Sequence, residues 1–428
     1  MMILLAFCLL FIPAALTAAF RASVVKVDIT PETPKFLLGY AARQSTGVHD
    51  RIFHRIVAMD DGDSKFLLVS TDLCLFSPTV YEDAAKRIEK ETGIPAMRFW
   101  WTVTHTHSAP EIGPPGVYKV LLKGRSEHPV DEEYTEWIVS ALVQGAKDAI
   151  ARLEPARVAI GTGMAMANIN RRARDVDGKI SLGLNPDGPV DRQIGLIRME
   201  KADGTPLVLI ANYAMHGTVL SGKFLQISGD AQGIVAGYVE QKTGAPMLYI
   251  NGAAGNIAPV YSVYDTPASG HLMQFNVLLG DRILAANRAI GGATGEVKLW
   301  VGEKWVDTPR KKGLDWTEDL PSYTRTSASG RPLVRLPVRF LKINDTVIWS
   351  APVEMFCEIS ISVRGQSPFP NTFYFGYTNG WIGYLPTREG FAEGGYEPAT
   401  SVFSDQVERD VTEAVVSYLQ GIPRGARP

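Results

Sequence analysis

The pattern of apolar and polar positions in the first quarter of the chain predicts a strand pair, a helix and a further strand. Residues 52–59 and 66–71 are β-branched or apolar and flank a turn rich in Asp, which predicts two paired strands. A helix is expected next, with Thr79 as its N-cap and Gly93 at its end. Residues 99–103 then predict a buried strand. The strand–helix–strand order predicts two parallel strands with a right-handed crossover.

The same alternation continues downstream. Apolar residues at helical spacing over 131–153 predict a packing helix. Further strands are expected at 207–213, 247–251, 347–350 and 373–377, and further helices near 233–243, 356–363 and 405–419. Residues 295–329 are irregular and rich in Lys, Asp, Pro and Thr, which predicts an inserted hairpin or surface segment. The expected class is therefore α/β, with a mixed, largely parallel sheet flanked by helices.

Composition supports a folded globular protein and narrows its partners. A length of 428 residues with 46% apolar residues suits one large domain or two ordinary ones. The formal charge is −2 and no block of Lys and Arg stands out. This excludes nucleic acid, and an anionic membrane, as electrostatic partners and leaves a neutral or lipid-like substrate open.

The first 19 residues predict a cleavable signal peptide. An apolar run closes in the small residues Thr17, Ala18 and Ala19. The run falls short of the roughly 20 apolar residues of a membrane span, so an uncleaved anchor is the alternative. Export to a secreted or periplasmic location follows, with residues 20–428 as a single large catalytic domain. Cys74 and Cys357 then remain, and their apolar surroundings predict two free, buried thiols.

Candidate chemistry gathers in loops that follow predicted strands, where open α/β sheets assemble ligand sites. His105 and His107 are two residues apart, so on an extended backbone both side chains address one centre. This favours a metal site as much as a pair of hydrogen-bonded loop histidines. Taken singly, His216 fits a structural histidine, Glu354 a helix N-terminal acid, and Tyr384 an ordinary half-buried aromatic residue.

A series of short motifs runs along most of the chain. They are Val27-Asp28-Ile29-Thr30-Pro31, Thr104-His105-Thr106-His107-Ser108, Asn170-Arg171, His216-Gly217-Thr218, Ser228-Gly229-Asp230, Pro352-Val353-Glu354 and Tyr396-Glu397-Pro398-Ala399-Thr400. In this order the sequence resembles the neutral/alkaline (non-lysosomal) ceramidase family, from about residue 22 to the end. The resemblance implies an exported zinc-dependent hydrolase that cleaves the amide bond of a ceramide-like N-acyl lipid, with zinc-bound water as the nucleophile. A lipid substrate also leaves transient contact with a membrane surface open.

The resemblance further implies which residues form the site, at the C-terminal ends of the strands. The implied zinc ligands are His105, His216, Glu354 and Tyr384. Tyr396 competes with Tyr384 for the last position. His107 and Arg171 are implied near the scissile amide, where they would polarise the carbonyl and stabilise an oxyanion, the alternatives being a hydrogen bond for His107 and a surface ion pair for Arg171. Asp72 and Asp230 would orient the ligand histidines.

One motif departs from the family. The family's Gly-Asp-x-Ser-Pro aligns with residues 255–259, where Asn256 replaces the aspartate and Ala258 the serine. Asn256 keeps its hydrogen-bonding capacity and stays a candidate catalytic residue, whereas Ala258 can neither attack nor orient a carbonyl. A water nucleophile survives this change. The C-terminal β-domain of full-length family members is expected to be missing. The alternatives are a zinc hydrolase of another amide, an ester or a carbohydrate-linked substrate, and a non-catalytic lipid- or glycan-binding member.

Overall fold

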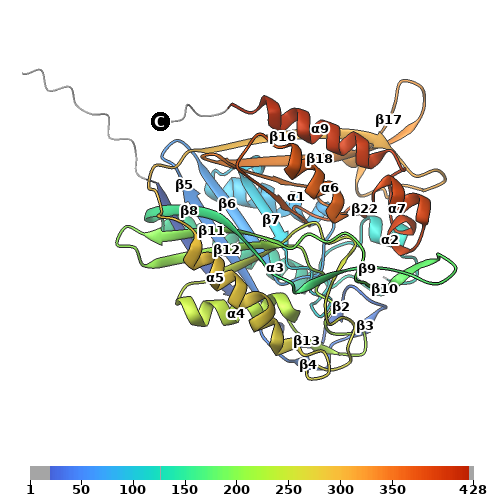
Figure 1. The fold of residues 1–428 in the computed structure, drawn as a ribbon, viewed down its shortest axis with the longest axis horizontal. Helices are drawn as coiled ribbons and strands as arrows, with labels where there is room; N and C mark the ends of the chain where they lie inside the picture. The colour runs from blue at the N-terminus through green and yellow to red at the C-terminus, as the bar shows by residue number, and fades with distance from the viewer. Residues whose placement is uncertain (1–19, 126, 424–428) are drawn as a thin grey trace, which may run out of the picture.

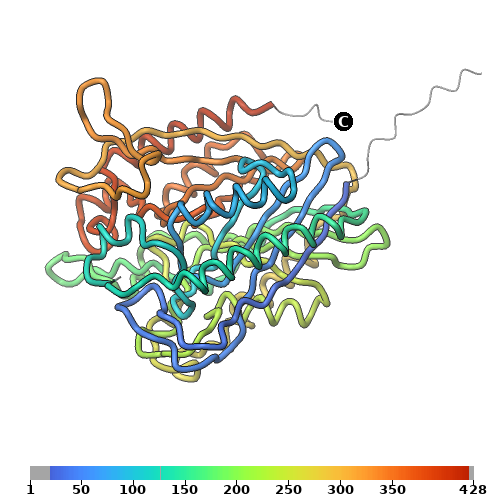
Figure 2. The backbone as a smooth tube through the Cα atoms, turned by 180° about the vertical axis from the view of Figure 1, so that it is seen from behind, coloured from blue at the N-terminus to red at the C-terminus, as the bar shows by residue number. Residues whose placement is uncertain are grey.

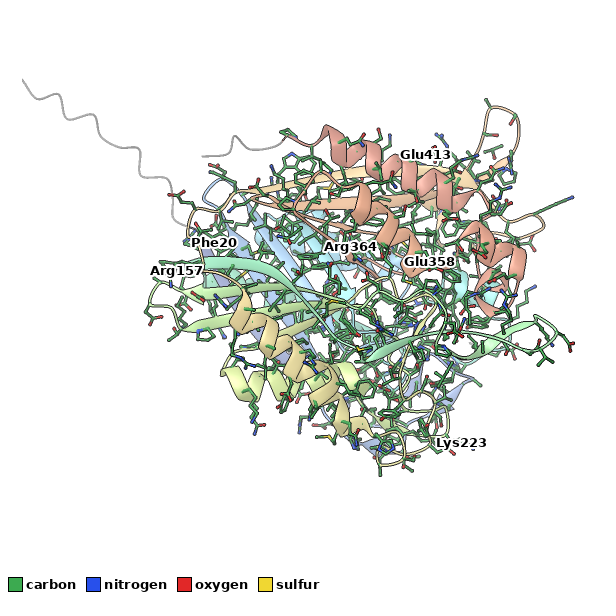
Figure 3. All side chains as sticks on the ribbon, viewed as in Figure 1. Phe20, Arg157, Lys223, Glu358, Arg364 and Glu413 are labelled. Atoms are coloured by element: carbon green, nitrogen blue, oxygen red, sulfur yellow. The ribbon has the colours of Figure 1, made fainter. Side chains whose placement is uncertain are left out.

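The computed structural model describes residues 20–125 and 127–423, and the predicted signal peptide lies outside these ranges (Figure 1). Two β-sheets pack against each other, and helices cover both outer faces. In Figure 1, α6 and α9 lie on one outer side and α4 and α5 on the opposite side. Phe20, at the start of the described chain, is buried in the core between the sheets (Figure 3). The expected α/β class is confirmed.

The larger sheet has eight strands in the order β14-β12-β11-β8-β1-β5-β6-β7. In chain order they are β1 Arg21–Asp28, β5 Phe53–Asp60, β6 Lys65–Thr71, β7 Phe99–Val103, β8 Glu154–Met164, β11 Gln193–Lys201, β12 Pro206–Tyr213 and β14 Met247–Asn251. The pairs β6–β7 and β12–β14 run parallel, as the strand–helix–strand pattern predicted. The other neighbours run antiparallel, so the expectation of a largely parallel sheet is wrong. The reason is that β5 and β6 form a hairpin and that β1, β8 and β11, which the pattern did not reveal, all join the sheet antiparallel to their neighbours.

The smaller sheet has the order β16-β18-β19-β21, with β17 paired to β18. Its strands are β16 Leu299–Pro309, β17 Thr324–Thr326, β18 Pro332–Ile343, β19 Thr346–Ser350 and β21 Asn371–Phe375. The segment expected to be an irregular insertion therefore contains β16, which pairs with β18 along its whole length. Its pattern was unclear because β16 is half-buried over most of its length and carries few fully apolar positions.

Short strands connect the ends of the two sheets. They are β2 Phe36–Leu37, β3 Arg43–Gln44, β4 Gly47–Val48, β9 Asn168–Arg174, β10 Ile180–Asn185, β13 Gln226–Ile227, β15 Ile257–Pro259, β20 Glu354–Met355 and β22 Tyr384–Leu385. Among them, β9 pairs with both β10 and β15, and β20 pairs with β22 in parallel. These strands build the end of the molecule where the candidate site lies.

The helices cover the outer faces. The longer ones are α1 Pro78–Thr92, α3 Glu132–Ala151, α4 Asp230–Thr243, α5 Asp281–Ala289, α6 Cys357–Gln366 and α9 Val407–Gly421. The short ones are α2 Val117–Leu121, α7 Arg388–Glu393, α8 Tyr396–Ala399, η1 Ala96–Arg98, η2 Leu272–Gln274, η3 Asn276–Gly280 and η4 Pro321–Tyr323. Seen from behind, α1 and α3 lie side by side over the strands of the larger sheet (Figure 2). The N-cap of α1 is Ser77 rather than Thr79, since the Ser77 hydroxyl accepts from the Thr79 backbone N–H.

Strand alternation explains why both faces of each sheet are buried. In β12, Val208 and Ile210 enter the core between the sheets, whereas Leu209 and Ala211 pack under α4 and α5. Cys74 and Cys357 are buried and free, as expected. Among the described residues, none of the helices has the length and apolar character that a membrane span requires.

Candidate metal centre

Four predicted ligands meet at the ends of strands from both sheets. His105 follows β7, and His216 follows β12 of the larger sheet. Glu354 opens β20 and Tyr384 opens β22, where the two residues stand opposite each other in register. The backbone of His105 has a φ of 67°, a strained value that turns its ring out of the strand direction. All four side chains are buried.

The candidate ligand atoms lie close enough to one another to share one metal ion. Glu354 Oε2 lies 3.2 Å from His105 Nε2 and 3.0 Å from His216 Nε2. The Tyr384 hydroxyl lies 3.4 Å from His216 Nε2. Zinc bonds of about 2.0–2.1 Å at tetrahedral angles place neighbouring ligand atoms about 3.3 Å apart. The observed separations therefore leave room for an ion of this size at their centre.

Hydrogen bonds at the far ring nitrogens fix the direction of the two histidines. His105 Nδ1 lies 2.8 Å from the Cys74 carbonyl, and His216 Nδ1 lies 2.7 Å from the Ala254 carbonyl. Carbonyls only accept, so Nδ1 carries the proton and Nε2 presents a lone pair in each neutral ring. Both lone pairs then point at a carboxylate oxygen. The two lone pairs and the carboxylate oxygen repel one another unless a cation lies between them. This arrangement is the strongest local sign of a metal site.

The electrostatics favour the protonation states that a metal requires. Burial, together with Arg171 and His105, lowers the pKa of His216 to about 3. Burial alone would raise the pKa of Glu354, but His105 and His216 hold it well below its ordinary value. At neutral pH, His216 is therefore neutral and Glu354 is ionised, the forms in which these side chains bind metal ions.

Two aromatic residues that the sequence did not single out hold the Glu354 carboxylate. The Trp381 indole donates to Oε1 at 2.9 Å, and the Tyr377 hydroxyl lies 3.3 Å from Oε2. The Tyr377 ring also stacks on His105, with ring centroids 4.2 Å apart. The bond to Trp381 directs the other oxygen of Glu354 toward the histidines.

His107 and Arg171 lie beside the four ligands. His107 Nε2 is 3.3 Å from His105 Nε2, and burial with the neighbouring histidines lowers the pKa of His107 well below its ordinary value. Arg171 donates to the Tyr384 hydroxyl at 3.1 Å and to Glu397 at 2.9 Å. Arg171 and Glu397 are both buried, so the surface ion pair considered for Arg171 is excluded.

Three other expectations do not match the geometry. Asp72 binds the Phe53 backbone and the Arg55 guanidinium, and Asp230 accepts from the backbone N–H groups of residues 219, 220 and 231. The backbone carbonyls described above, and not these carboxylates, orient the histidines. Asn256 accepts from the Cys357 N–H at 3.0 Å and donates to Glu358 at 2.7 Å. Its amide is thus engaged behind the site, and its backbone carbonyl supports Arg171 instead.

A cavity of about 520 Å³ opens beside the four ligands. Its walls are formed by Gly39, Tyr40, His107, Arg125, Arg171, Leu182, Gly183, Leu184, Thr218, Ala258, Ser262, Val263, Tyr384 and Tyr396. Ala258 lies in this wall, at the position where the family motif carries serine. Tyr396 faces the same cavity and meets Tyr384 edge-on, with ring centroids 5.7 Å apart. The volume suits a small organic ligand.

Fold and site together define an α/β protein with a buried candidate metal centre of two histidines and a glutamate. The family model for the neutral/alkaline non-lysosomal ceramidases, N-terminal part, matches residues 20–258. This match covers more than half of the chain, so the chain belongs to the neutral/alkaline non-lysosomal ceramidase family.

Individual relatives agree with this assignment. The chain is 27% identical to the neutral ceramidase of Pseudomonas aeruginosa over 268 residues, which are 59% of this chain and 38% of that protein. It is 29% identical to the neutral ceramidase of Mycobacterium tuberculosis over 234 residues, or 51% of this chain and 35% of that protein. The matches thus span well under half of the length of these relatives.

Solved structures match the fold over nearly the whole chain. The structure described as a ceramidase complexed with C2 superposes with a TM-score of 0.76 at 18% identity, covering 96% of this chain and 77% of that one. The crystal structure of the P. aeruginosa neutral ceramidase gives a TM-score of 0.76 at 20% identity, covering 96% and 76%. The fold beyond residue 258 is therefore shared as well.

Proposed function

We propose that this protein is a zinc-dependent hydrolase that cleaves the amide bond of a ceramide-like N-acyl lipid. The observation that carries the proposal is the pair of Nε2 lone pairs and the Glu354 oxygen that face one another at 3.0–3.2 Å beside a ligand-sized cavity. The names of the relatives, which are neutral ceramidases, support the substrate class.

His105, His216 and Glu354 would hold the metal, with the Tyr384 oxygen as the fourth ligand. A bound zinc ion supplies Lewis-acid chemistry, which activates water and polarises a carbonyl. The donor set fits this ion, because imidazole nitrogen and hard oxygen suit zinc. The nucleophile in this proposal is water, since Ala258 offers no hydroxyl in the cavity wall.

Arg171 and His107 act on the substrate in this proposal. The Arg171 guanidinium is fixed by Glu397 and by the Tyr384 hydroxyl, so its orientation is set before substrate arrives. A fixed cation at the cavity wall stabilises the negative charge that develops on the amide oxygen. Burial and the neighbouring histidines lower the pKa of His107 well below its ordinary value, so the ring is neutral at neutral pH and its N–H can donate to the amide oxygen.

The test is hydrolysis by the purified, zinc-loaded protein, followed as fatty acid released from ceramide, a short N-acyl amide and an aryl ester. We expect release from an amide, loss of release after treatment with a chelator, and recovery when zinc is restored. A zinc-loaded protein that cleaves the ester but no amide would instead favour the esterase alternative. No release from any acyl substrate would favour the alternative of a non-catalytic lipid- or glycan-binding protein.

We further propose that the protein is exported after removal of residues 1–19, which would leave a mature N-terminus near Phe20. The burial of Phe20 in the core between the sheets supports a cleavage site before this residue rather than after it. Mass spectrometry of the exported protein measures the terminus. An intact Met1 would favour the membrane-anchored alternative.

A further inference from the structure

The cavity beside the candidate metal centre has cationic side chains and no acidic ones in the walls that the structure describes. Arg125 and Arg171 both line it. The charge of Arg171 is offset by Glu397, which also pairs with Arg172 at 2.7 Å. Within the described residues, Arg125 forms no ion pair with a carboxylate. The cavity therefore carries a positive charge that the protein itself leaves uncompensated.

Arg125 lies close to Tyr396 in the wall of the cavity. Burial raises the pKa of Tyr396, and Arg125 and Arg171 both act to lower it. Both guanidinium groups are thus close enough to the phenol to influence its ionisation. An anion placed beside Tyr396 would have the Arg125 guanidinium and the Tyr396 hydroxyl as donors, next to the residues proposed to act on the amide.

Another part of the wall is apolar and partly open. Leu182 and Leu184, on β10, are 52% and 50% exposed, and Val263 is 58% exposed. All three line the cavity. Large apolar side chains that stay exposed around a pocket indicate a ligand with an apolar part. The cavity therefore combines an apolar wall for an acyl chain with a cationic wall for a charged head.

We propose that the cavity prefers N-acyl amides whose amine half carries a carboxylate, such as N-acyl amino acids, over neutral amides of the same size, and that Arg125 binds this carboxylate. The inference rests on the proposed hydrolase function. A carboxylate forms a paired, charge-assisted hydrogen bond with a guanidinium, whereas a neutral head leaves the charge of Arg125 without an anionic partner.

The reaction needs no further reactant. Water adds its oxygen to the acyl carbon, and the carbon–nitrogen bond breaks. The oxygen stays with the fatty acid, and the nitrogen leaves with the bonding electrons and takes up protons to become the ammonium group of the amino acid. No atom changes its oxidation state, so neither an oxidant nor a reductant is required.

The experiment compares N-dodecanoylglycine with N-dodecanoylglycinamide, which share chain and size and differ in charge. The parent protein is expected to hydrolyse the carboxylate with a kcat/KM about 10- to 100-fold higher, the usual size of a hydrogen bond to a charged group. Arg125→Gln should bring the ratio close to one, and Arg125→Lys should keep part of it. Lys123→Gln is the matched control, because Lys123 is exposed on the same loop and does not line the cavity.

A parent ratio of one or less would overturn the inference, as would a ratio that survives Arg125→Gln. If neither compound is hydrolysed, the proposed hydrolase function fails, and calorimetric binding of the same two compounds then decides the inference. Tighter binding of the carboxylate that is lost in Arg125→Gln supports it. Equal binding of both compounds by the parent overturns it.

Discussion

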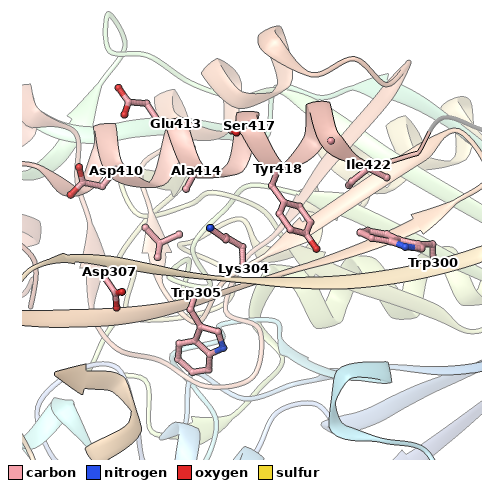
Figure 4. Close-up of a pocket in the computed structure, with 12 residues that line it drawn as sticks. Trp300, Lys304, Trp305, Asp307, Asp410, Glu413, Ala414, Ser417, Tyr418 and Ile422 are labelled. Carbon is pink, nitrogen blue, oxygen red and sulfur yellow. The ribbon is translucent and has the colours of Figure 1, made fainter.

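The cavity at the candidate metal centre and the groove between β16 and α9 differ in their walls more than in their size. The groove is the larger, at about 830 Å³ against about 520 Å³. Its walls come from one strand and one helix, with Trp300, Lys304 and Tyr418 among them (Figure 4). The cavity is lined by segments from many parts of the chain that meet at the ends of two sheets.

The two regions also differ in which polar groups face one another. In the groove, opposite charges meet: Asp307 forms ion pairs with Arg325 and Arg335, and Asp410 accepts from Thr308 at 2.8 Å. Around Glu354, by contrast, the lone pairs of two histidines face a carboxylate oxygen. Opposite charges that meet stabilise a surface, whereas lone pairs that face one another indicate a cation between them. The kind of groups that face one another is therefore a better guide to a site than volume.

The largest difference between substitutions at the candidate metal centre and in the groove is expected when a proposed metal ligand is removed. His216→Ala should reduce the metal content from about one ion per chain to a small fraction, because three ligands of this set no longer close a tetrahedral site. Amide hydrolysis should fall below detection with it. Lys304→Ala in the groove should change neither quantity. Metal analysis of both variants measures the effect, and full metal content in His216→Ala would contradict the ligand assignment.

A smaller loss is expected at Arg171. Arg171→Gln should lower kcat by about 10²–10³, the usual effect of removing one donor to a developing oxyanion. Most of the metal content should remain, since His105, His216 and Glu354 are unchanged and only Tyr384, among the proposed ligands, loses a hydrogen bond from Arg171. Arg335→Gln, which removes an ion-pair partner of Asp307 in the groove, provides the comparison and should leave kcat unchanged. Steady-state kinetics on one amide substrate test this, and an unchanged kcat in Arg171→Gln would exclude the proposed role.

The indole bond to Glu354 allows a closely matched test. Trp381 donates to Glu354 at 2.9 Å, and Trp305 in the groove donates to Glu303 at 2.8 Å. Trp381→Phe should weaken metal affinity by about 10- to 100-fold, because the carboxylate loses the partner that directs it. Trp305→Phe removes the same kind of bond and should leave metal affinity as it is. Chelator competition measures both, and equal affinities in the two variants would show that Trp381 is only a packing residue.

The smallest effect concerns pH in the metal-free protein. His216 has a folded pKa of about 3, so between pH 7.5 and 5.5 the unfolded chain takes up a proton that the folded chain does not. Stability therefore falls as the pH is lowered, by about 1 kcal/mol for this group. His216→Gln should remove that part of the slope, whereas Lys304→Ala should keep it. Asp230, whose pKa burial raises to about 6, acts in the opposite sense in all three proteins and cancels in the comparison.

Urea unfolding at the two pH values gives this difference directly. A parent and a His216→Gln variant with the same pH slope would show that His216 is not the source.

The local apolar pattern alone predicted the bounds of strands that are buried on both faces. The strands at 99–103 and 247–251 match β7 and β14 at both ends, because continuous apolar runs bounded by turns leave little choice. Strands β8 and β16 were missed because most of their positions are half-buried or exposed and neither strand shows a clear apolar run. Pairing between distant segments is also decided by the whole sheet rather than by local residues.

Within the site, sequence motifs identified the residues but did not show the direction in which their side chains point. His105, His216, Glu354 and Tyr384 were named from motifs, and the structure brings them together. The position of Asn256 in a motif gave no sign that its amide binds Cys357 and Glu358. Hydrogen-bond geometry depends on which way a side chain points, and a sequence does not contain that information.

The parallel pairing of β20 with β22 has a consequence for how the protein is made. It places Glu354 opposite Tyr384, so half of the ligand set comes from the last fifth of the chain. When both histidines have been synthesised, the nascent chain still lacks Glu354 and Tyr384 and cannot yet surround an ion. With the proposed ligand set, metal loading would be a late event in biogenesis, complete only after synthesis has passed Tyr384. A chain truncated before that point would emerge with a histidine pair but without a centre.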